Sequence, residues 1–251
     1  MKRFPLFQLA LLLILFSCDH IPTEKDAIEI NQQGIVLMNA GKYDSALSSF
    51  LIAIQNPKLS KDTKGTIYRN IALTYIDLAK TDSAIHYSTL AAKCFKKNSF
   101  KYLINSADVD LLKGKTGMAL SSLLKAVNIY PDEMSVNNSL GLIYLGEYDE
   151  AYIDLDKALK YNSKAFEIDG SRIIEEVLAR TFYKQEDYEN AELHYEHLLQ
   201  NYPDMISYSL DMGMVKHKLK KFAQAEKLFK LLLVKDSSYK ETIDFFKENN
   251  R

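Results

Sequence analysis

Two histidines on a predicted helix have a spacing that suits metal chemistry. His194 and His197 lie three residues apart, so a helix places both imidazoles on one face, where two nitrogens can bind one metal ion. A protein metal site takes at least three ligands, and the sequence contains no His-Glu-x-x-His motif. We therefore interpret the pair as part of an exposed helix surface and predict no bound metal.

The sequence contains no recognised catalytic motif. Gly-x-Ser-x-Gly, Walker and Gly-x-Gly-x-x-Gly sequences are all absent. His217 stands alone, and Cys94 follows two alanines near the end of a predicted helix, which favours a buried, inert thiol. With 2 cysteines, a disulfide scaffold and a four-cysteine zinc site are both excluded. We predict that the protein is not an enzyme and has no cofactor.

Cys18 is the residue for which the sequence predicts a covalent modification. The chain begins Met1-Lys2-Arg3 and is then apolar from Leu6 to Phe16 apart from Gln8, which is typical of a secretory signal. This run is shorter than the about 20 residues of a membrane-spanning helix. Leu15-Phe16-Ser17-Cys18 resembles the bacterial lipobox, in which a small residue precedes the cysteine that becomes the lipid-modified N-terminus. The resemblance implies that acyl chains on Cys18 anchor the protein to a membrane.

This start of the chain sets the first two predicted segments. Residues 1–17 are the lipoprotein signal peptide, and residues 18–26 are a lipid-anchored tether. The formal net charge of −1 gives no electrostatic argument for nucleic acid binding. Cleavage removes two basic residues, so the charge becomes 30 − 33 = −3. Asp19 resembles an inner-membrane retention signal of enteric bacteria, but other groups of bacteria do not use this signal. We favour the outer membrane of a bacterial cell envelope, and the sequence leaves the choice of membrane open.

Small residues recur through the rest of the chain at nearly constant intervals. The first set is separated by 38, 35, 34, 38 and 34 residues: Gly34, Ala72, Ala107, Gly141, Ala179 and Gly213. A second set follows twelve residues later, or ten in the fourth case: Ala46, Ala84, Ala119, Ala151, Ala191 and Ala225. Because small side chains let two helices cross closely, the pattern predicts pairs of helices. The low content of Gly (9) and Pro (5) agrees with a mostly helical chain.

The period and the residue types resemble the tetratricopeptide repeat (TPR), a helix–turn–helix unit of 34 residues. The resemblance covers about residues 27–237 and places the two small residues at positions 8 and 20 of six repeats. Large residues are typical of position 24, where the chain has Phe50, Ser88, Leu123, Leu155, Tyr195 and Phe229. The resemblance implies an all-α, right-handed α-solenoid, because a lone repeat cannot bury its apolar face. Residues 238–251 are predicted to form a C-terminal capping helix, with a capping box between Ser238 and Glu241.

Repeat 4 departs from the regular pattern. Ala151 follows Gly141 by ten residues, so two residues are missing before the turn Gly146-Glu147-Tyr148-Asp149. Extra residues then follow at 163–171. We therefore predict an irregular joint between repeats 4 and 5.

In the TPR family the first helix of each repeat lines a concave groove, into which positions 2, 5, 9, 12 and 13 usually point. The matching residues are Asn31, Ile35, Met38, Arg69, Leu73, Ile76, Lys101, Ile104, Asp108, Asn138, Leu142, Glu176, Arg180, Tyr183, Leu210, Met214 and His217. This mixture of apolar and charged side chains suits a partner peptide or helix. The alternative interpretation is that several of them only pack against a neighbouring helix or the cap.

Charge is distributed unevenly along the repeats. Residues 216–235 hold seven lysines, whereas segments 147–156 and 186–196 are rich in Asp and Glu. These segments are either solvated helix faces or an ionic docking patch for a protein partner or anionic lipid.

The sequence thus predicts a membrane-anchored scaffold or assembly factor of the bacterial envelope that binds a protein partner. The resemblance suggests envelope-assembly lipoproteins, including pilotin-type proteins that escort secretins. No small-molecule substrate is expected. Two other classes stay open. A glycan-binding nutrient-uptake lipoprotein is one, although sugar platforms favour Trp, which is absent. An envelope hydrolase is the other, and it needs a nucleophile–base pair or metal triad.

Overall fold

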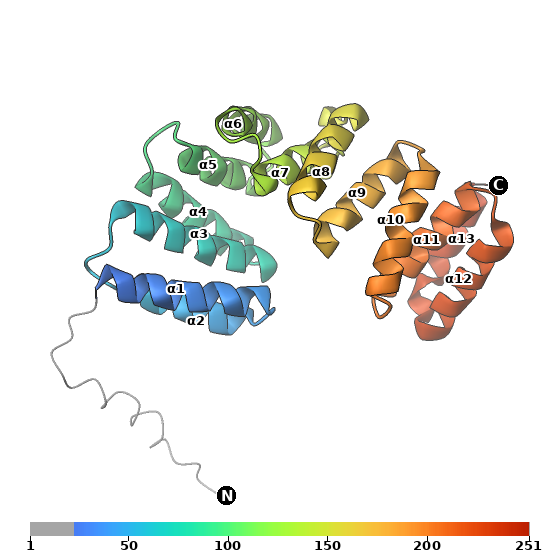
Figure 1. Ribbon diagram of the computed structural model, residues 1–251, viewed down its shortest axis with the longest axis horizontal. Coiled ribbons are helices and arrows are strands. Elements are labelled where there is room, and N and C mark those ends of the chain that lie inside the picture. The colour runs from blue at the N-terminus through green and yellow to red at the C-terminus, as the bar shows by residue number, and fades with distance from the viewer. Residues whose placement is uncertain (1–22, 251) are drawn as a thin grey trace, which may run out of the picture. The chain divides into compact units, whose positions relative to one another are not determined.

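The computed structural model describes residues 23–250, and every regular element among them is helical. The predictions for the signal peptide, Cys18 and most of the tether lie outside these residues. The elements are α1 (Glu24–Asn39), α2 (Tyr43–Ala53), α3 (Lys61–Asp77), α4 (Thr81–Cys94), α5 (Phe100–Leu112), α6 (Thr116–Ile129), α7 (Met134–Tyr144), η2 (Glu150–Tyr152), α8 (Leu155–Ile168), α9 (Arg172–Lys184), α10 (Tyr188–Asn201), α11 (Ser207–Lys218), α12 (Phe222–Lys235), η3 (Ser237–Tyr239) and α13 (Lys240–Glu248). Within each unit, consecutive helices pack as first and second helices of a repeat, as in the α1–α2, α3–α4, α7–α8, α9–α10 and α11–α12 pairs (Figure 1). The predicted fold class, an all-α solenoid of TPR-like pairs, is confirmed.

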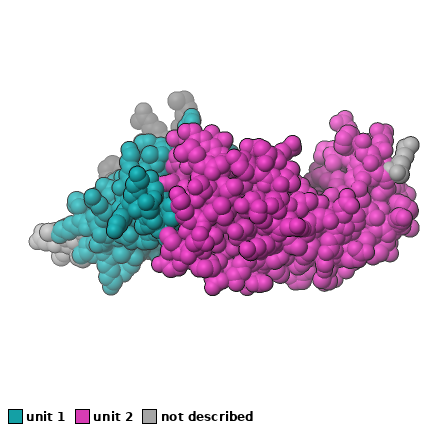
Figure 2. All heavy atoms as spheres, turned by 90° about the horizontal axis from the view of Figure 1, so that it is seen from above, with its two compact units in different colours: residues 1–105 teal, residues 106–251 magenta. Residues whose placement is uncertain are grey.

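The chain divides into two compact units within α5 (Figure 2). Unit 1 ends at Asn105 and unit 2 begins at Ser106. In unit 1, α1 packs on α2 and α3 packs on α4. In unit 2, the same pairing joins α7 to α8, α9 to α10 and α11 to α12. None of the helices between residues 23 and 250 has the length and apolar character needed to cross a membrane.

The recurring small residues lie where paired helices cross. A Cβ added to Gly34 would overlap the ring of Phe50, and one added to Gly213 would overlap the ring of Phe229. These rings come from position 24 of the second helix. Ala119 and Ala191, at position 20, are 0% exposed. Close packing at this density leaves no room for larger side chains, which explains the sequence pattern.

A residue in the left-handed region ends the first helix of each repeat. Glycine meets this requirement in three repeats, at Gly41 (φ 71°), Gly114 (φ 69°) and Gly146 (φ 85°). Ala79 (φ 54°), Glu186 (φ 64°) and Lys220 (φ 60°) adopt it in the other three. A side chain in this region is strained because its Cβ crowds the backbone, so these three turns are less favourable than the glycine turns.

The predicted register of repeat 4 is wrong. α7 ends two residues early, as the sequence predicts, but the second helix does not begin until Leu155. Ala151 is exposed in η2, and the buried small residue of the second helix is Ala158, which is 0% exposed. A Cβ on Gly141 would overlap the side chain of Asn162. Asn162 therefore occupies position 24, which was assigned to Leu155.

The error has a simple physical origin. Tyr148-Asp149-Glu150-Ala151 and Leu155-Asp156-Lys157-Ala158 are similar segments seven residues apart, or about two helical turns, so either could start the helix. Asp154 selects the later start because its carboxylate accepts a hydrogen bond from Lys157 N at 3.1 Å. The extra residues therefore lie inside repeat 4, before α8. The predicted irregular joint at 163–171 is wrong, since α8 continues to Ile168.

The last helix packs on the end of unit 2. Ile243 and Phe246 of α13 are 1% and 7% exposed and pack in one cluster with Phe229. The predicted capping box does not form, because α13 has no side-chain cap. Instead Asp236 accepts a hydrogen bond from Ser238 N at 2.9 Å, and the chain enters α13 through η3.

Candidate partner-binding site

In unit 1 the predicted groove residues include some that are buried. Asn31 is 8% exposed, and its Oδ1 accepts a hydrogen bond from Asn70 Nδ2 at 2.9 Å. Ile104 is also 8% exposed. Ile35 and Met38 are partly buried against the core of α1, α2 and α3. The Asn31–Asn70 hydrogen bond joins α1 to α3, and the burial of these side chains agrees with the packing interpretation.

The remaining groove residues of unit 1 are more accessible. Arg69 and Leu73 are half-buried, and Ile76 is 40% exposed. Lys101 Nζ lies 2.6 Å from Asp62 Oδ2 and 5.4 Å from the centre of the Phe95 ring. Lys101 therefore joins α5 to α3 and lies over the end of α4.

In unit 2, three predicted groove residues meet in one cavity of about 230 Å³, which we call the α9–α11 hollow. Arg180 and Tyr183 come from α9, and Met214 comes from α11. The other lining residues are Lys184, Tyr195 and Asp211. Arg180 and Tyr183 share a helix face because they are three residues apart, and the same spacing brings Asp211 beside Met214.

Both cations of the α9–α11 hollow have carboxylate neighbours. Arg180 Nε lies 3.8 Å and Lys184 Nζ lies 3.6 Å from Oε1 of Glu147. Lys184 Nζ also donates a hydrogen bond to the carbonyl oxygen of Leu145 at 3.0 Å. The turn of repeat 4 therefore places one carboxylate near both cations, while Arg180 Nε is buried and has no hydrogen-bond partner among residues 23–250.

Glu176, another predicted groove residue, is hydrogen-bonded within the same face. Tyr208 Oη donates to Glu176 Oε2 at 2.8 Å, and Arg172 Nη1 donates to Tyr208 Oη at 2.7 Å. Arg172 also lies 3.7 Å from Glu176 Oε2. This chain of contacts links α9 to α11 and compensates the charge of Glu176.

Asp211 differs from the other charged groups of the hollow. None of residues 23–250 donates a hydrogen bond to Asp211 or forms an ion pair with it. Burial and the negative charge of Glu176 raise the pKa of Asp211 to about 6, against the opposing effect of Arg180. Burial, aided by Tyr188 and Asp211, raises the pKa of Tyr183 to about 12. The hollow thus combines neutral tyrosines with one carboxylate that lacks a partner.

The other groove residues of unit 2 have different surroundings. Asp108, Asn138 and Leu142 are half-buried and do not line the hollow. Leu210 packs against the cluster that contains Phe229 and Phe246.

His217 also contacts the cap. Its ring lies 5.2 Å from that of Phe246 and 4.9 Å from that of Phe222. Burial and the charges of Lys247 and Lys218 lower the pKa of His217. His217 is therefore a packing residue under α13.

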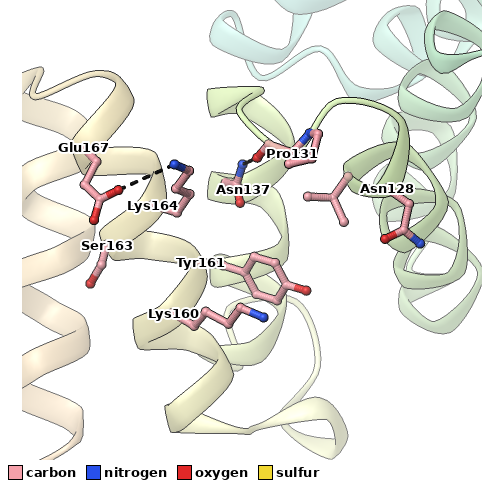
Figure 3. Close-up of a pocket in the computed structure, with 9 residues that line it drawn as sticks. Asn128, Pro131, Asn137, Lys160, Tyr161, Ser163, Lys164 and Glu167 are labelled. Atoms are coloured by element: carbon pink, nitrogen blue, oxygen red, sulfur yellow. Dashed lines mark hydrogen bonds and ion pairs between the residues drawn. The ribbon is translucent and has the colours of Figure 1, made fainter.

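A second cavity of unit 2, of about 400 Å³, lies among α6, α7 and α8 (Figure 3). Tyr161 of α8 points into it, and no predicted groove residue lines it. Asn137 donates hydrogen bonds to the carbonyl oxygens of Pro131 and Glu133 at 2.8 and 2.9 Å. Lys164 Nζ lies 2.9 Å from Asp132 Oδ1 and 3.6 Å from Glu167 Oε2. Asn137 and Lys164 are thus already bonded to neighbouring residues, so fewer polar groups of this cavity are available to bind a ligand.

The two histidines of α10 bind a buried carboxylate that the sequence does not point to. His194 Nδ1 lies 3.1 Å and His197 Nδ1 lies 2.8 Å from the two oxygens of Glu175, which is 3% exposed. The interpretation as an exposed surface is wrong for His194, whose side chain is 16% exposed and stacks on Phe182. Within the described part of the chain, no group of three such side chains, this one included, is arranged so that it could hold a metal ion.

Cys94 is a free, half-buried thiol at the end of α4. Its Cβ lies against Gly65 of α3, where an added Cβ would approach it to 2.8 Å. Burial raises the pKa of Cys94 in spite of Lys64 and Lys61. A raised pKa keeps the sulfur protonated, which makes it a poor nucleophile.

The acidic and the lysine-rich segments of unit 2 partly neutralise each other. Lys216 Nζ lies 2.5 Å from Glu192 Oε1 and 2.9 Å from Glu196 Oε1. Lys221 Nζ lies 2.7 Å from Glu192 Oε2. These ion pairs join α10 to the α11–α12 pair, so part of the lysine-rich segment has a structural role.

No known family model matches the sequence, and no curated protein is significantly similar to it. Solved structures are similar to this fold. One is TTC0263, a thermophilic TPR protein of Thermus thermophilus, with a TM-score of 0.58, 19% identity and coverage of 75% of this chain and 98% of that chain. Another is PilF of Pseudomonas aeruginosa, with a TM-score of 0.64, 17% identity and coverage of 90% and 99%.

A third similar structure is a chain of the Cut9–Hcn1 hetero-tetramer of the APC/C. Its TM-score is 0.71 at 15% identity, over 88% of this chain and 42% of that chain. At these identities the similarity shows the fold alone, and the fold is that of TPR proteins.

Proposed function

We propose that this chain is a membrane-anchored scaffold of the bacterial envelope that binds a partner peptide or helix and has no catalytic activity. The TPR-type fold supports a role in protein–protein interaction, since stacked repeats present an extended surface to a partner. In this proposal, acyl chains on Cys18 anchor the protein to the membrane. The support for this anchor is the sequence pattern alone.

The α9–α11 hollow is the observation that carries the proposal. Five of its six lining residues come from first helices, and three of these, Arg180, Tyr183 and Met214, lie at positions predicted for partner contact, beside Asp211. Aromatic, methionine and arginine side chains are enriched at protein interfaces, whereas an exposed helix surface made only for solubility is mostly charged.

Affinity capture of the full chain from the native host tests the binding role. We expect one partner to be retained by the natural protein and lost when Tyr183→Ala is introduced. Tyr130→Ala is the matched control, because Tyr130 is 57% exposed and lies outside the hollow. Loss of the partner in both variants, or in neither, contradicts the proposed site.

The anchor is tested separately. Mass spectrometry of the purified protein is expected to show an acylated N-terminal Cys18, and Cys18→Ser is expected to move the protein out of the membrane fraction. Membrane attachment that survives Cys18→Ser contradicts the predicted lipid anchor.

A further inference from the structure

We propose that the α9–α11 hollow binds a basic side chain, Arg or Lys, of the partner protein, with Asp211 as the acceptor of its hydrogen bonds. This inference rests on the proposed function and adds the chemistry of the residue that enters the site.

Charge complementarity favours a cation over an anion. Arg180 and Lys184 already lie within 4 Å of Glu147, and Glu176 accepts from Tyr208. Asp211 is the charged lining residue that receives no hydrogen bond or ion pair from the chain as described between residues 23 and 250. An acidic side chain would face the Asp211 carboxylate, whose neighbour Glu176 is also negative, whereas a basic one would supply the missing partner.

The size and the walls of the hollow suit one long side chain. Its volume of about 230 Å³ lies below the roughly 300–1,000 Å³ of small-molecule sites. Tyr183 and Tyr195 provide aromatic rings, and Met214 provides a flexible apolar contact. A lysine or arginine can lay its methylene stem along such walls, and its charged head is attracted to the face of an aromatic ring.

The site also predicts a pH dependence for binding. The groups that face Asp211 are Glu176, Arg180 and Tyr183 of α9 and Tyr195 of α10. Among them Glu176 raises the pKa of Asp211, and Arg180 lowers it. Protonation of Asp211 as the pH falls below about 6 removes the negative charge that a basic side chain needs. Binding is therefore expected to weaken between pH 7 and pH 5.

A library of random twelve-residue peptides displayed on phage, selected against the full chain, tests the inference. We expect the enriched peptides to share an Arg or Lys, and replacement of that residue by Gln to weaken binding at least tenfold. Asp211→Asn is expected to weaken binding by a similar factor. Asp204→Asn, in the exposed segment before α11, is the matched control and is expected to leave binding unchanged.

Three outcomes overturn the inference. Enriched peptides without a basic residue, or with an acidic one in its place, exclude the proposed occupant. A second outcome is that the peptides need Tyr183 but bind the Asp211→Asn variant with normal affinity. This result leaves the scaffold function intact and excludes the role of Asp211. If no peptide is enriched, the peptide-binding function and the inference both fail. Asp211→Asn removes a charge without an ion-pair partner, and an unchanged melting temperature or an increase confirms that this variant folds.

Discussion

Repeats 4 and 5 are neighbours in unit 2, and they use their polar side chains differently. In repeat 4, the second helix is displaced and the cavity beside Tyr161 is surrounded by groups that bind one another, such as Lys164 and Asp132. In repeat 5, the register is regular and the first helix faces a hollow in which Asp211 has no partner among the described residues. The difference suggests that repeat 4 stabilises the stack, while repeat 5 and α11 present a surface to a partner.

The largest expected effect tests the displaced helix of repeat 4. Ala158→Leu is expected to lower the free energy of unfolding by about 3 kcal/mol, because Ala158 is 0% exposed and an added side chain overpacks the crossing. Ala151→Leu is expected to change it by less than about 0.5 kcal/mol, because Ala151 is exposed. Chemical denaturation measures both. If Ala151→Leu destabilised the protein more than Ala158→Leu, the register predicted from the sequence would be correct.

The buried carboxylate of repeat 5 is expected to give the next largest effect. Glu175→Ala removes the acceptor of His194 and His197 and is expected to cost about 2 kcal/mol in unfolding free energy. Glu189→Ala, at an exposed position of α10, is the control and is expected to cost less than about 0.5 kcal/mol. Equal stability of the two variants would show that the Glu175 contacts contribute nothing.

Asp211 is expected to destabilise the free protein at neutral pH. Its pKa is about 6 in the folded chain against an ordinary value of 3.8, so the folded state binds the proton more tightly. The contribution of Asp211 to stability therefore falls as the pH rises from about 4 to about 6 and levels off above. Asp211→Asn removes this change and is expected to stabilise the protein at pH 7 by on the order of 2 kcal/mol. Thermal melts of both proteins at pH 4 and pH 7 measure this stabilisation. An equal change in melting temperature on Asp211→Asn at the two pH values would contradict the expectation.

The smallest effect concerns the left-handed turn residues. Glu186→Gly in repeat 5 is expected to add about 0.5–1 kcal/mol of stability, because glycine adopts a φ of 64° without strain. Gly146→Ala in repeat 4 is expected to destabilise by at least about 1 kcal/mol, because the Cβ would also approach Ile153. The melting temperature of each variant measures these effects. A shift of both melting temperatures in the same direction would contradict this account.

The sequence predicts the pairing of helices well because only small side chains fit where two helices cross. Gly34 and Gly213 are fixed by the rings of Phe50 and Phe229, so their period follows the period of the fold. Repeat 4 could not be predicted in the same way, since Ala151 and Ala158 differ by two helical turns and present the same pattern. In the structure, the cap at Asp154 and the packing of Asn162 on Gly141 distinguish them.

The candidate site was only partly predictable. Arg180, Tyr183 and Met214 follow from the groove positions of the family, whereas Asp211 lies at position 6, which that pattern leaves out. Its spacing of three residues from Met214 was the available signal. That Asp211 has no ion-pair partner follows from the packing of α9 against α11, because Glu147 and Tyr208 engage the other charges. A single sequence does not carry this information.

Photo-crosslinking in the native host tests the central claim most directly. A photoreactive amino acid placed at Tyr183 probes the α9–α11 hollow, and the same amino acid at Tyr161 probes the cavity of Figure 3. We expect a protein adduct from position 183 and none from position 161. An adduct from position 161 alone would place the partner on repeat 4 and contradict the assignment of the hollow as the binding site.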